Sequence, residues 1–277
     1  MKKFLLALTA VAAMTGSASA ADLGARPYTK APEPIAYAPS WTGFYVFGGF
    51  GGGLWNADSN VNSTGVVGSF GSFGAAGTAI TRDHRLGGSG WFGTVGAGYD
   101  WQFSKWVAGI FGDGQFGDIR GSLSDPLFAI EGREKLRDSY AAGVRLGYLV
   151  APNVLSYVNA GYSGSEWSGT TLTTLAAGGG TGITTTGSFR RDGWFVGGGV
   201  ENSFDIFGIT APGWFMKTEY RSAFYDRISL PQTFVPGNAF AGVGLSGTAA
   251  TFKPWTQTIS TSLVYRFNWS GPVVAKY

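Results

Sequence analysis

The stretch WFGTVGAGYDWQF, residues 91–103, decides how the rest of this sequence is interpreted. Alternate residues of a β-strand point to opposite faces. One face would carry Trp91, Val95, Ala97, Tyr99, Trp101 and Phe103, and the other Thr94, Gly96, Gly98, Asp100 and Gln102. A half-buried strand of a soluble sheet also alternates, but here the apolar face has aromatic ends and the opposite face is small or polar. That combination is typical of a strand between lipid and a narrow polar lumen.

Seven further segments alternate in a similar way, although residues 42–55 do so poorly because Tyr45 and Phe47 interrupt the inner face. The other segments are residues 106–116, 139–150, 154–163, 194–204, 214–224 and 257–267. Short turns at residues 104–105 and 151–153 alternate with long polar stretches at residues 57–88, 118–138, 165–190 and 226–254. We therefore predict an all-β fold, an eight-stranded antiparallel up-and-down transmembrane β-barrel.

Charged residues within these strands fall on the face opposite the aliphatic residues. This predicted lumen charge network consists of Asp100, Asp113, Arg145, Glu201, Lys217, Glu219, Arg221 and Arg266. A soluble eight-stranded ligand carrier would show the reverse polarity, with apolar side chains inside. Exposed rows of Trp, Tyr and Val would also be an aggregation hazard in water, so the sequence favours the membrane barrel.

The two ends of the chain predict processing and tethering. Lys2 and Lys3, the apolar run 4–14 and the small residues 18–20 are typical of a secretory signal peptide over residues 1–20. The apolar run is shorter than the roughly 20 residues of a spanning helix. We predict a Pro- and Ala-rich periplasmic arm over residues 21–40, an outer-membrane barrel over residues 41–269 and a C-terminal tail over residues 270–277.

Composition excludes several classes of protein. There is no Cys, which excludes a disulfide scaffold and a lipid-modified Cys. Abundant Trp, Tyr and Phe argue against disorder. Without the two signal-peptide lysines, 18 basic residues stand against 17 acidic ones, and no basic stripe suggests a nucleic-acid partner. We expect no cofactor and no metal site.

The sequence offers little for catalysis. The only histidine, His84, lies in the first long polar stretch beside Arg82, Asp83 and Arg85, where a solvated residue is the ordinary interpretation. Barrel lipases use Ser and His near the interface, and haem or metal contact is the other alternative for His84. Two G-x-G-x-x-G matches, residues 88–93 and 112–117, do not join a strand to a helix as dinucleotide binding requires. We expect no enzyme and no catalytic residue.

Several short segments resemble the porin-family surface antigens of alphaproteobacteria, outer-membrane barrels of the opacity-protein and OmpA-like membrane-domain class. The segments are WTGFYV (41–46), GVRLGY (143–148), GWFVGGGVE (193–201), KTEYR (217–221) and VYRFNWSGPVVAKY (264–277). The chain departs from the family pattern at Val264, where Asn is expected, and at Phe111, where an acidic residue is common. The resemblance implies an outer-membrane barrel of a Gram-negative bacterium, with Phe267 as the signal for the barrel-assembly machinery although ten residues follow it.

An eight-stranded barrel has an interior that side chains fill. We therefore expect a structural, surface-exposed protein of the cell outer membrane, with a largely closed polar lumen and four long extracellular loops. Its expected partners are outer-membrane lipids, lipopolysaccharide, the assembly machinery and an extracellular ligand at the loops. The alternatives are a small-solute porin, or a surface receptor that binds haem or a host ligand through its loops.

Overall fold

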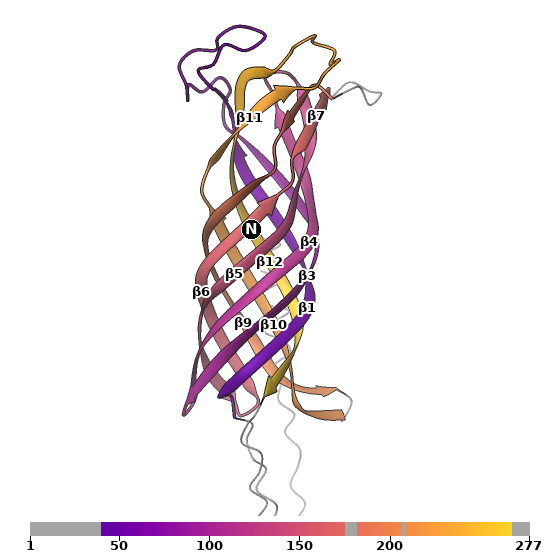
Figure 1. Ribbon diagram of the computed structural model, residues 1–277. Helices are drawn as coiled ribbons and strands as arrows, with labels where there is room; N and C mark the ends of the chain where they lie inside the picture. The colour runs from indigo at the N-terminus through magenta and orange to yellow at the C-terminus, as the bar shows by residue number, and fades with distance from the viewer. Residues whose placement is uncertain (1–39, 175–181, 207–208, 268–277) are drawn as a thin grey trace, which may run out of the picture. The chain divides into compact units, whose positions relative to one another are not determined.

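The computed structural model describes residues 40–174, 182–206 and 209–267, and within them the only regular secondary structure is β (Figure 1). The signal peptide, all of the arm except Ser40, and the C-terminal tail predicted above lie outside the described residues. Eight strands are long. They are β1 (Gly43–Ser59), β3 (His84–Phe103), β4 (Trp106–Asp125), β5 (Ile130–Ala151), β6 (Val154–Trp167), β9 (Phe189–Ile206), β10 (Ile209–Tyr225) and β12 (Leu245–Phe267).

The long strands pair antiparallel in chain order and close on themselves. Each pairs with the next along the series β1-β3-β4-β5-β6-β9-β10-β12. The last strand returns to the first, with a ladder that runs from Phe44 opposite Phe267 to Asp58 opposite Lys253. The prediction of an all-β, antiparallel, up-and-down sheet is therefore confirmed.

The predicted number of eight strands is not confirmed for the total, because the described residues form twelve. The four short strands are β2 (Val61–Ser63), β7 (Thr170–Thr174), β8 (Thr184–Thr186) and β11 (Ile228–Phe234). They continue the wall beyond the ends of the long strands: β7 pairs with β5 and β8, β8 with β11, and both β11 and β2 with β12. In Figure 1 these pairings lie at the upper end of the barrel.

The long polar loop predicted over residues 118–138 is also wrong. The strands β4 and β5 run through most of it and are joined by the four residues 126–129. Ile119, Leu123, Ile130 and Leu136 are buried inside the wall, while most of the charged residues between them, among them Arg120, Glu131 and Arg133, are exposed. Charge on an outward face suits a strand in water as well as a loop, which is why composition was misleading. Residues 165–190 and 226–254 likewise contain strand over much of their described length.

The predicted short turns are confirmed at the opposite end. Residues 104–105 join β3 to β4, and residues 152–153 join β5 to β6. Ser104 takes a left-handed backbone conformation with φ 57°, which a two-residue hairpin turn with a right-handed strand twist favours.

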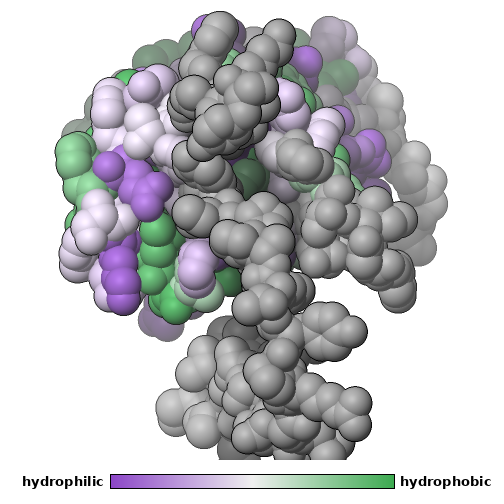
Figure 2. Space-filling model, turned by 90° about the horizontal axis from the view of Figure 1, so that it is seen from below, coloured by the Kyte–Doolittle hydropathy of each residue, from purple (hydrophilic) through white to green (hydrophobic). Residues whose placement is uncertain are grey.

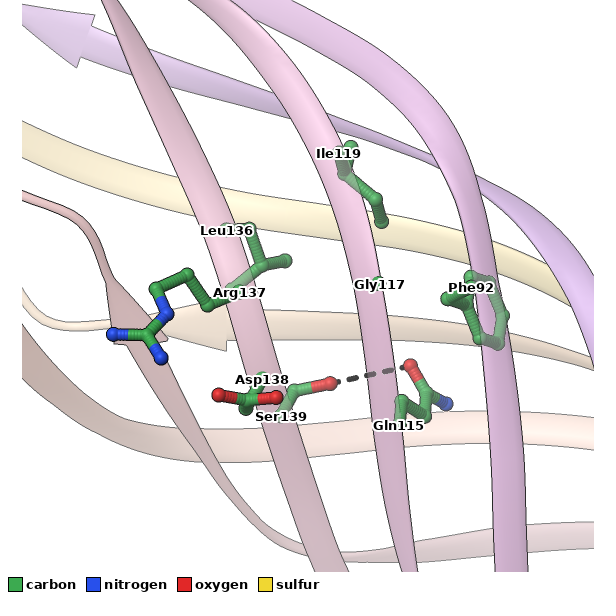
Figure 3. A pocket seen from close by; sticks show the side chains of 8 residues that line it. All are labelled: Phe92, Gln115, Gly117, Ile119, Leu136, Arg137, Asp138 and Ser139. Carbon is green, nitrogen blue, oxygen red and sulfur yellow. Dashed lines mark hydrogen bonds between the residues drawn. The ribbon is translucent and has the colours of Figure 1, made fainter.

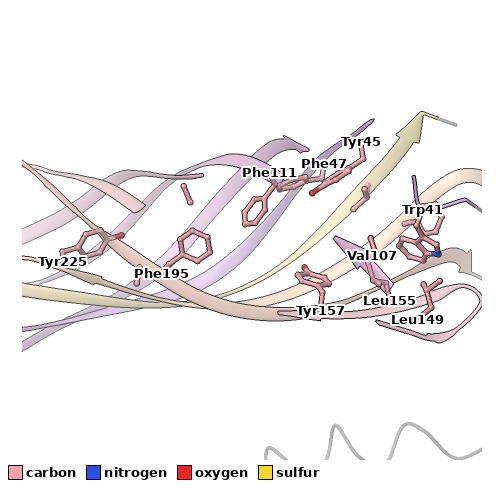
Figure 4. Close-up of a cluster of buried hydrophobic side chains, with 14 residues drawn as sticks. Trp41, Tyr45, Phe47, Val107, Phe111, Leu149, Leu155, Tyr157, Phe195 and Tyr225 are labelled. Carbon is pink, nitrogen blue, oxygen red and sulfur yellow. The ribbon is translucent and has the colours of Figure 1, made fainter. Parts of the chain in front are cut away.

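Glycines on the inner face of β3 make room for aromatic rings on β1. A Cβ atom at Gly96 would lie 2.4 Å from the ring of Phe47, and one at Gly98 would lie 2.4 Å from the Tyr45 hydroxyl. Both rings point into the barrel, where they join a buried cluster that runs along the interior (Figure 4). The Gly-rich strands therefore permit bulky rings inside a narrow barrel.

Candidate functional site: the charged barrel interior

All eight residues of the predicted lumen charge network lie inside the barrel, and none is more than 8% exposed. They form two groups of four, each with two acidic and two basic side chains. The first group joins four different strands, β3, β5, β9 and β12, and the second joins β4 to β10. Each group is electrically balanced, as burial of charge requires.

The first group consists of Asp100, Arg145, Glu201 and Arg266. Arg145 donates from Nε to Asp100 Oδ1 at 2.8 Å and from Nη1 to Glu201 Oε2 at 3.0 Å. Arg266 donates to the same two carboxylates, from Nη1 to Asp100 Oδ2 and from Nη2 to Glu201 Oε1, both at 2.7 Å. Each arginine therefore bridges both acids, in a closed square of charge-assisted hydrogen bonds.

Aromatic rings cover this group on the side of the short turns. The guanidinium of Arg266 lies 4.5 Å from the ring of Trp41 and 4.9 Å from that of Tyr45. The backbone N–H of Trp41 donates to Gln102 Oε1 at 2.9 Å, and its indole is fully buried. Sequence reasoning missed this role of Trp41 because the residue precedes the first strand and belongs to no alternating pattern.

The second group consists of Asp113, Lys217, Glu219 and Arg221. Arg221 forms a bidentate pair with Asp113, with distances of 2.9 and 2.7 Å, and also donates to Glu219 Oε1 at 2.7 Å. Lys217 Nζ lies 3.8 Å from Glu219 Oε2. The hydroxyl of Tyr157 donates to the same Oε2 at 2.8 Å.

Tyr157 connects the two groups, because its ring also lies 5.2 Å from the guanidinium of Arg145. The ring of Phe47 lies 3.2 Å from Lys217 Nζ, and that of Phe195 lies 4.6 Å from the Arg221 guanidinium. Aromatic faces attract cations, which explains why Tyr45 and Phe47 interrupt the expected polar inner face. Figure 4 shows Phe47, Phe195 and Tyr157 projecting into the interior from separate strands.

The outer face has the opposite character over the same height. The strand portions 44–54, 91–103, 106–116, 140–150, 156–162, 194–202, 214–224 and 255–267 contain no charged residue besides the eight buried ones. Exposed aromatic residues lie near both ends of these portions, for example Trp91 and Trp194 at one end and Trp101 and Trp106 at the other. Seen from the turn end, hydrophobic residues lie among hydrophilic ones around the visible rim (Figure 2).

Beyond these portions, toward the short strands, the polarity reverses. Arg85, Arg120, Arg133 and Arg190 are exposed there, and the interior is packed with Trp55, Trp167, Phe252 and their neighbours. We call the exposed and partly exposed charged residues of this region the charged collar: Asp58, Arg85, Asp118, Arg120, Glu131, Arg133, Lys135, Arg137, Asp138, Glu166, Arg190, Arg191, Asp192, Asp226, Arg227 and Lys253.

Two carboxyl groups are buried inside the collar region, and sequence reasoning missed both. Asp125 and Glu134 are fully shielded from solvent. Glu134 Oε2 accepts a hydrogen bond from the Thr170 hydroxyl at 2.9 Å, and burial raises the pKa of Glu134 to about 7. The alternation of buried Leu123, Ile130 and Leu136 on the same strands was the available signal, hidden by the charges between them.

A small cavity lies in the wall between β3, β4 and β5, where the β4–β5 register shifts between Phe116 and Ile119 (Figure 3). Gln115 and Ser139 line it and share a hydrogen bond of 3.2 Å. Its water-accessible volume is about 10 Å³, which is room for about one water molecule. A larger ligand does not fit this cavity.

His84 does not lie in a loop as expected. It is the first residue of β3, partly buried, with Nε2 at 3.2 Å from the Ser124 carbonyl oxygen. Among the described residues, no three His, Cys, Asp or Glu side chains are arranged to hold a metal ion. The described part of the chain also holds no helix long and apolar enough to cross a membrane.

Phe267, the expected assembly signal, is the last residue of β12. It is 37% exposed, and its ring lies 5.7 Å from that of Phe44 on the neighbouring strand. It therefore belongs to the exposed aromatic residues at the turn end of the barrel.

No family model and no curated protein matches this sequence. Similar solved structures include the outer membrane protease OmpT from Escherichia coli, with 10% identity and a TM-score of 0.40 over 85% of this chain and 99% of that one. OprG from Pseudomonas aeruginosa has 10% identity and a TM-score of 0.44 over 82% and 97%. Neisserial surface protein A has 13% identity and a TM-score of 0.37 over 82% and 98%. The fold described above rests on the strand pairings of this chain itself.

Proposed function

We propose that this chain is an outer-membrane β-barrel with eight membrane-spanning strands, a closed lumen and a structural, surface-exposed role. The observation that carries the proposal is the reversal of polarity along the barrel. Over one part of its height charges lie inside and apolar residues outside, and over the next part most charges lie outside, around an interior packed with apolar side chains. Lipid around the first part and water around the second account for both halves.

We call the outer face of the strand portions without exposed charge the uncharged band. Its height agrees with the thickness of the apolar part of a bilayer. Trp91 and Trp101 lie at its two ends on one strand, ten residues apart. At about 3.3 Å per residue and a tilt of about 40°, that separation corresponds to roughly 25 Å along the membrane normal. Outer-membrane barrels have an apolar band of about 25 Å between two aromatic girdles.

The packing of the lumen argues against a pore. The two charge groups and the rings of Tyr45, Phe47, Phe111 and Phe195 occupy the interior at the level of the band. We therefore favour the structural role over the small-solute porin, and expect no steady current of porin size in planar bilayers. The proposed function includes no enzymatic activity. Extracellular contacts are made by the end of the barrel that carries the short strands.

Cell fractionation and gel mobility test the proposal. The protein is expected in the outer-membrane fraction, with a folded band that changes mobility on heating. Trypsin applied to intact cells is expected to cut after Arg82, which lies outside the strands at the collar end, and not after Lys105, which lies in a short turn at the other end. Recovery in a soluble fraction, or cleavage after Lys105 in intact cells, would refute the proposal.

A further inference from the structure

The end of the barrel beyond the charged collar carries an exposed apolar surface, which we call the apolar tip. It consists of Val66, Val67, Phe70, Phe240, Val243 and Leu245. Five of the six lie in the loops between β2 and β3 and between β11 and β12, which are drawn at the top of Figure 1, and Leu245 begins β12. Val67 is 73% exposed and Val243 is 77% exposed. Gathered apolar side chains of this kind mark interaction sites.

Hydrogen bonds hold the two loops together. The Val243 N–H donates to the Ser69 hydroxyl at 2.8 Å, and that hydroxyl donates to the Val243 carbonyl. The Thr64 N–H donates to the Gly247 carbonyl at 3.0 Å. Asn238 closes its own loop, because its Nδ2 donates to the carbonyls of Val235 and Gly242 at 2.8 and 2.7 Å.

Aromatic packing supports the same surface from below. The ring of Phe70 meets that of Phe234 edge-on, with centroids 5.3 Å apart, and Phe234 is only 4% exposed. Phe128, from the turn between β4 and β5, lies 6.0 Å from Phe70 and 6.1 Å from Phe240. The tip is therefore preorganised, so that binding requires little ordering of its loops.

The loop segments that carry the tip residues are uncharged, and the charged pair Arg82 and Asp83 comes only where the first loop returns to β3. Residues 64–81 and 235–252 contain no Asp, Glu, Lys, Arg or His. The charged collar, in contrast, is rich in Asp, Glu, Lys and Arg. An uncharged apolar surface gives no electrostatic attraction to an anionic polysaccharide or lipid headgroup. It can face an identical surface without the like-charge repulsion that a charged tip would impose.

We propose that the apolar tip binds the apolar tip of a second copy of this chain on an opposing membrane. The inference rests on the proposed function, because barrels that share one orientation in a membrane all present their tips outward. Two identical patches meet around a twofold axis, so that the same residues serve on both sides.

The size of the tip sets the strength of this contact. A stable interface buries about 800 Å² per partner, which exceeds what six side chains on two loops offer. A single pair is therefore weak, and adhesion between membranes depends on many copies acting together. We expect a monomer in detergent and clustering of vesicles that carry many copies.

The test uses the full-length mature protein, refolded into neutral phosphatidylcholine vesicles, with clustering followed by light scattering. Vesicles that carry the protein are expected to cluster with each other and not with bare vesicles, at low and high salt alike. Val67→Asp or Val67→Lys in every copy is expected to slow clustering at least tenfold. Asn153→Asp is the matched control, because Asn153 is exposed in a turn at the opposite end of the barrel. This variant is expected to leave clustering unchanged.

A mixed experiment shows whether the partner is a second copy. Vesicles with Val67→Asp and vesicles with Val67→Lys are expected to cluster with each other at low salt, and 0.5 M salt is expected to abolish this rescue. Clustering with bare vesicles would show insertion into lipid and would overturn the proposal, as would full clustering by both Val67 variants alone. Absence of clustering by heat-modifiable, inserted protein would overturn the self-contact and leave the barrel assignment intact. Failure to insert would overturn both.

Discussion

Replacement of Glu201 by Gln tests the ionic interior directly. The Glu201 carboxylate is fully buried and accepts hydrogen bonds from Arg266 Nε at 2.9 Å, Arg266 Nη2 at 2.7 Å and Arg145 Nη1 at 3.0 Å. Gln keeps the shape of the side chain and removes its charge. Two arginines then share the single carboxylate of Asp100, and one buried positive charge has no counter-ion.

The expected loss of stability follows from the burial. Removing one partner of a buried ion pair costs about 3–5 kcal/mol, because the remaining charge is stranded in a region of low dielectric. An exposed pair is worth about 1 kcal/mol at most. Glu166→Gln is the matched control, because Glu166 pairs with Arg190 at 2.7 Å while the Arg190 side chain is 74% exposed. The two variants make the same chemical change in an ion pair and differ in burial.

Urea unfolding of the protein refolded in lipid vesicles measures both variants, with tryptophan fluorescence and heat-dependent gel mobility as independent readouts. Glu201→Gln is expected to lower the free energy of unfolding by several kcal/mol, and Glu166→Gln by no more than about 1 kcal/mol. Adding Arg266→Met to Glu201→Gln should restore part of the loss, because the surplus positive charge is then removed. Equal losses for the two single variants would show that Glu201 is not enclosed by its arginines.

Two further predictions concern the collar region and the outer face. Because burial raises the pKa of Glu134 from 4.5 to about 7, its protonated form is favoured in the folded state, and stability falls as pH rises between those values, by up to about 3 kcal/mol in total. Glu134→Gln, which cannot ionise, should match the wild type near pH 4 and exceed it near pH 8 in urea unfolding, and a pH-independent difference would refute the assignment. Val144 is 59% exposed on the uncharged band. Replacing it by Arg is expected to lower the free energy of unfolding in lipid by about 2–4 kcal/mol. The same change at Val67 on the tip should have little effect on the free energy of unfolding. Equal tolerance of Arg at both positions would show that Val144 does not face lipid.

The network of lumen charges could be predicted residue by residue, but its pairings could not. Parity along each strand was enough to assign Asp100 and Arg266 to the inner face, since side chains alternate with a period of two. No local sequence pattern predicts that these two residues are in contact, because they are separated by 166 positions. Their contact depends on the register of each ladder and on closure between β1 and β12.

The charged collar shows where sequence reasoning failed. Residues 118–138 were expected to be a loop because of their charged and polar composition. The strands continue past the uncharged band, however, and there the outward face no longer has to be apolar. Thr170–Thr174 and Ile228–Phe234 are strands that polar composition had hidden in the same way.

The sequence by itself determined the all-β class, the phase of each long strand within the uncharged band and the inward direction of the eight network charges, because these properties follow from a two-residue period. Only the tertiary structure decided which charges pair, how far the wall extends beyond the uncharged band, and that Trp41 covers the end of the lumen near the short turns. These features depend on register, tilt and closure of the sheet, which bring together residues from strands that are distant in the chain.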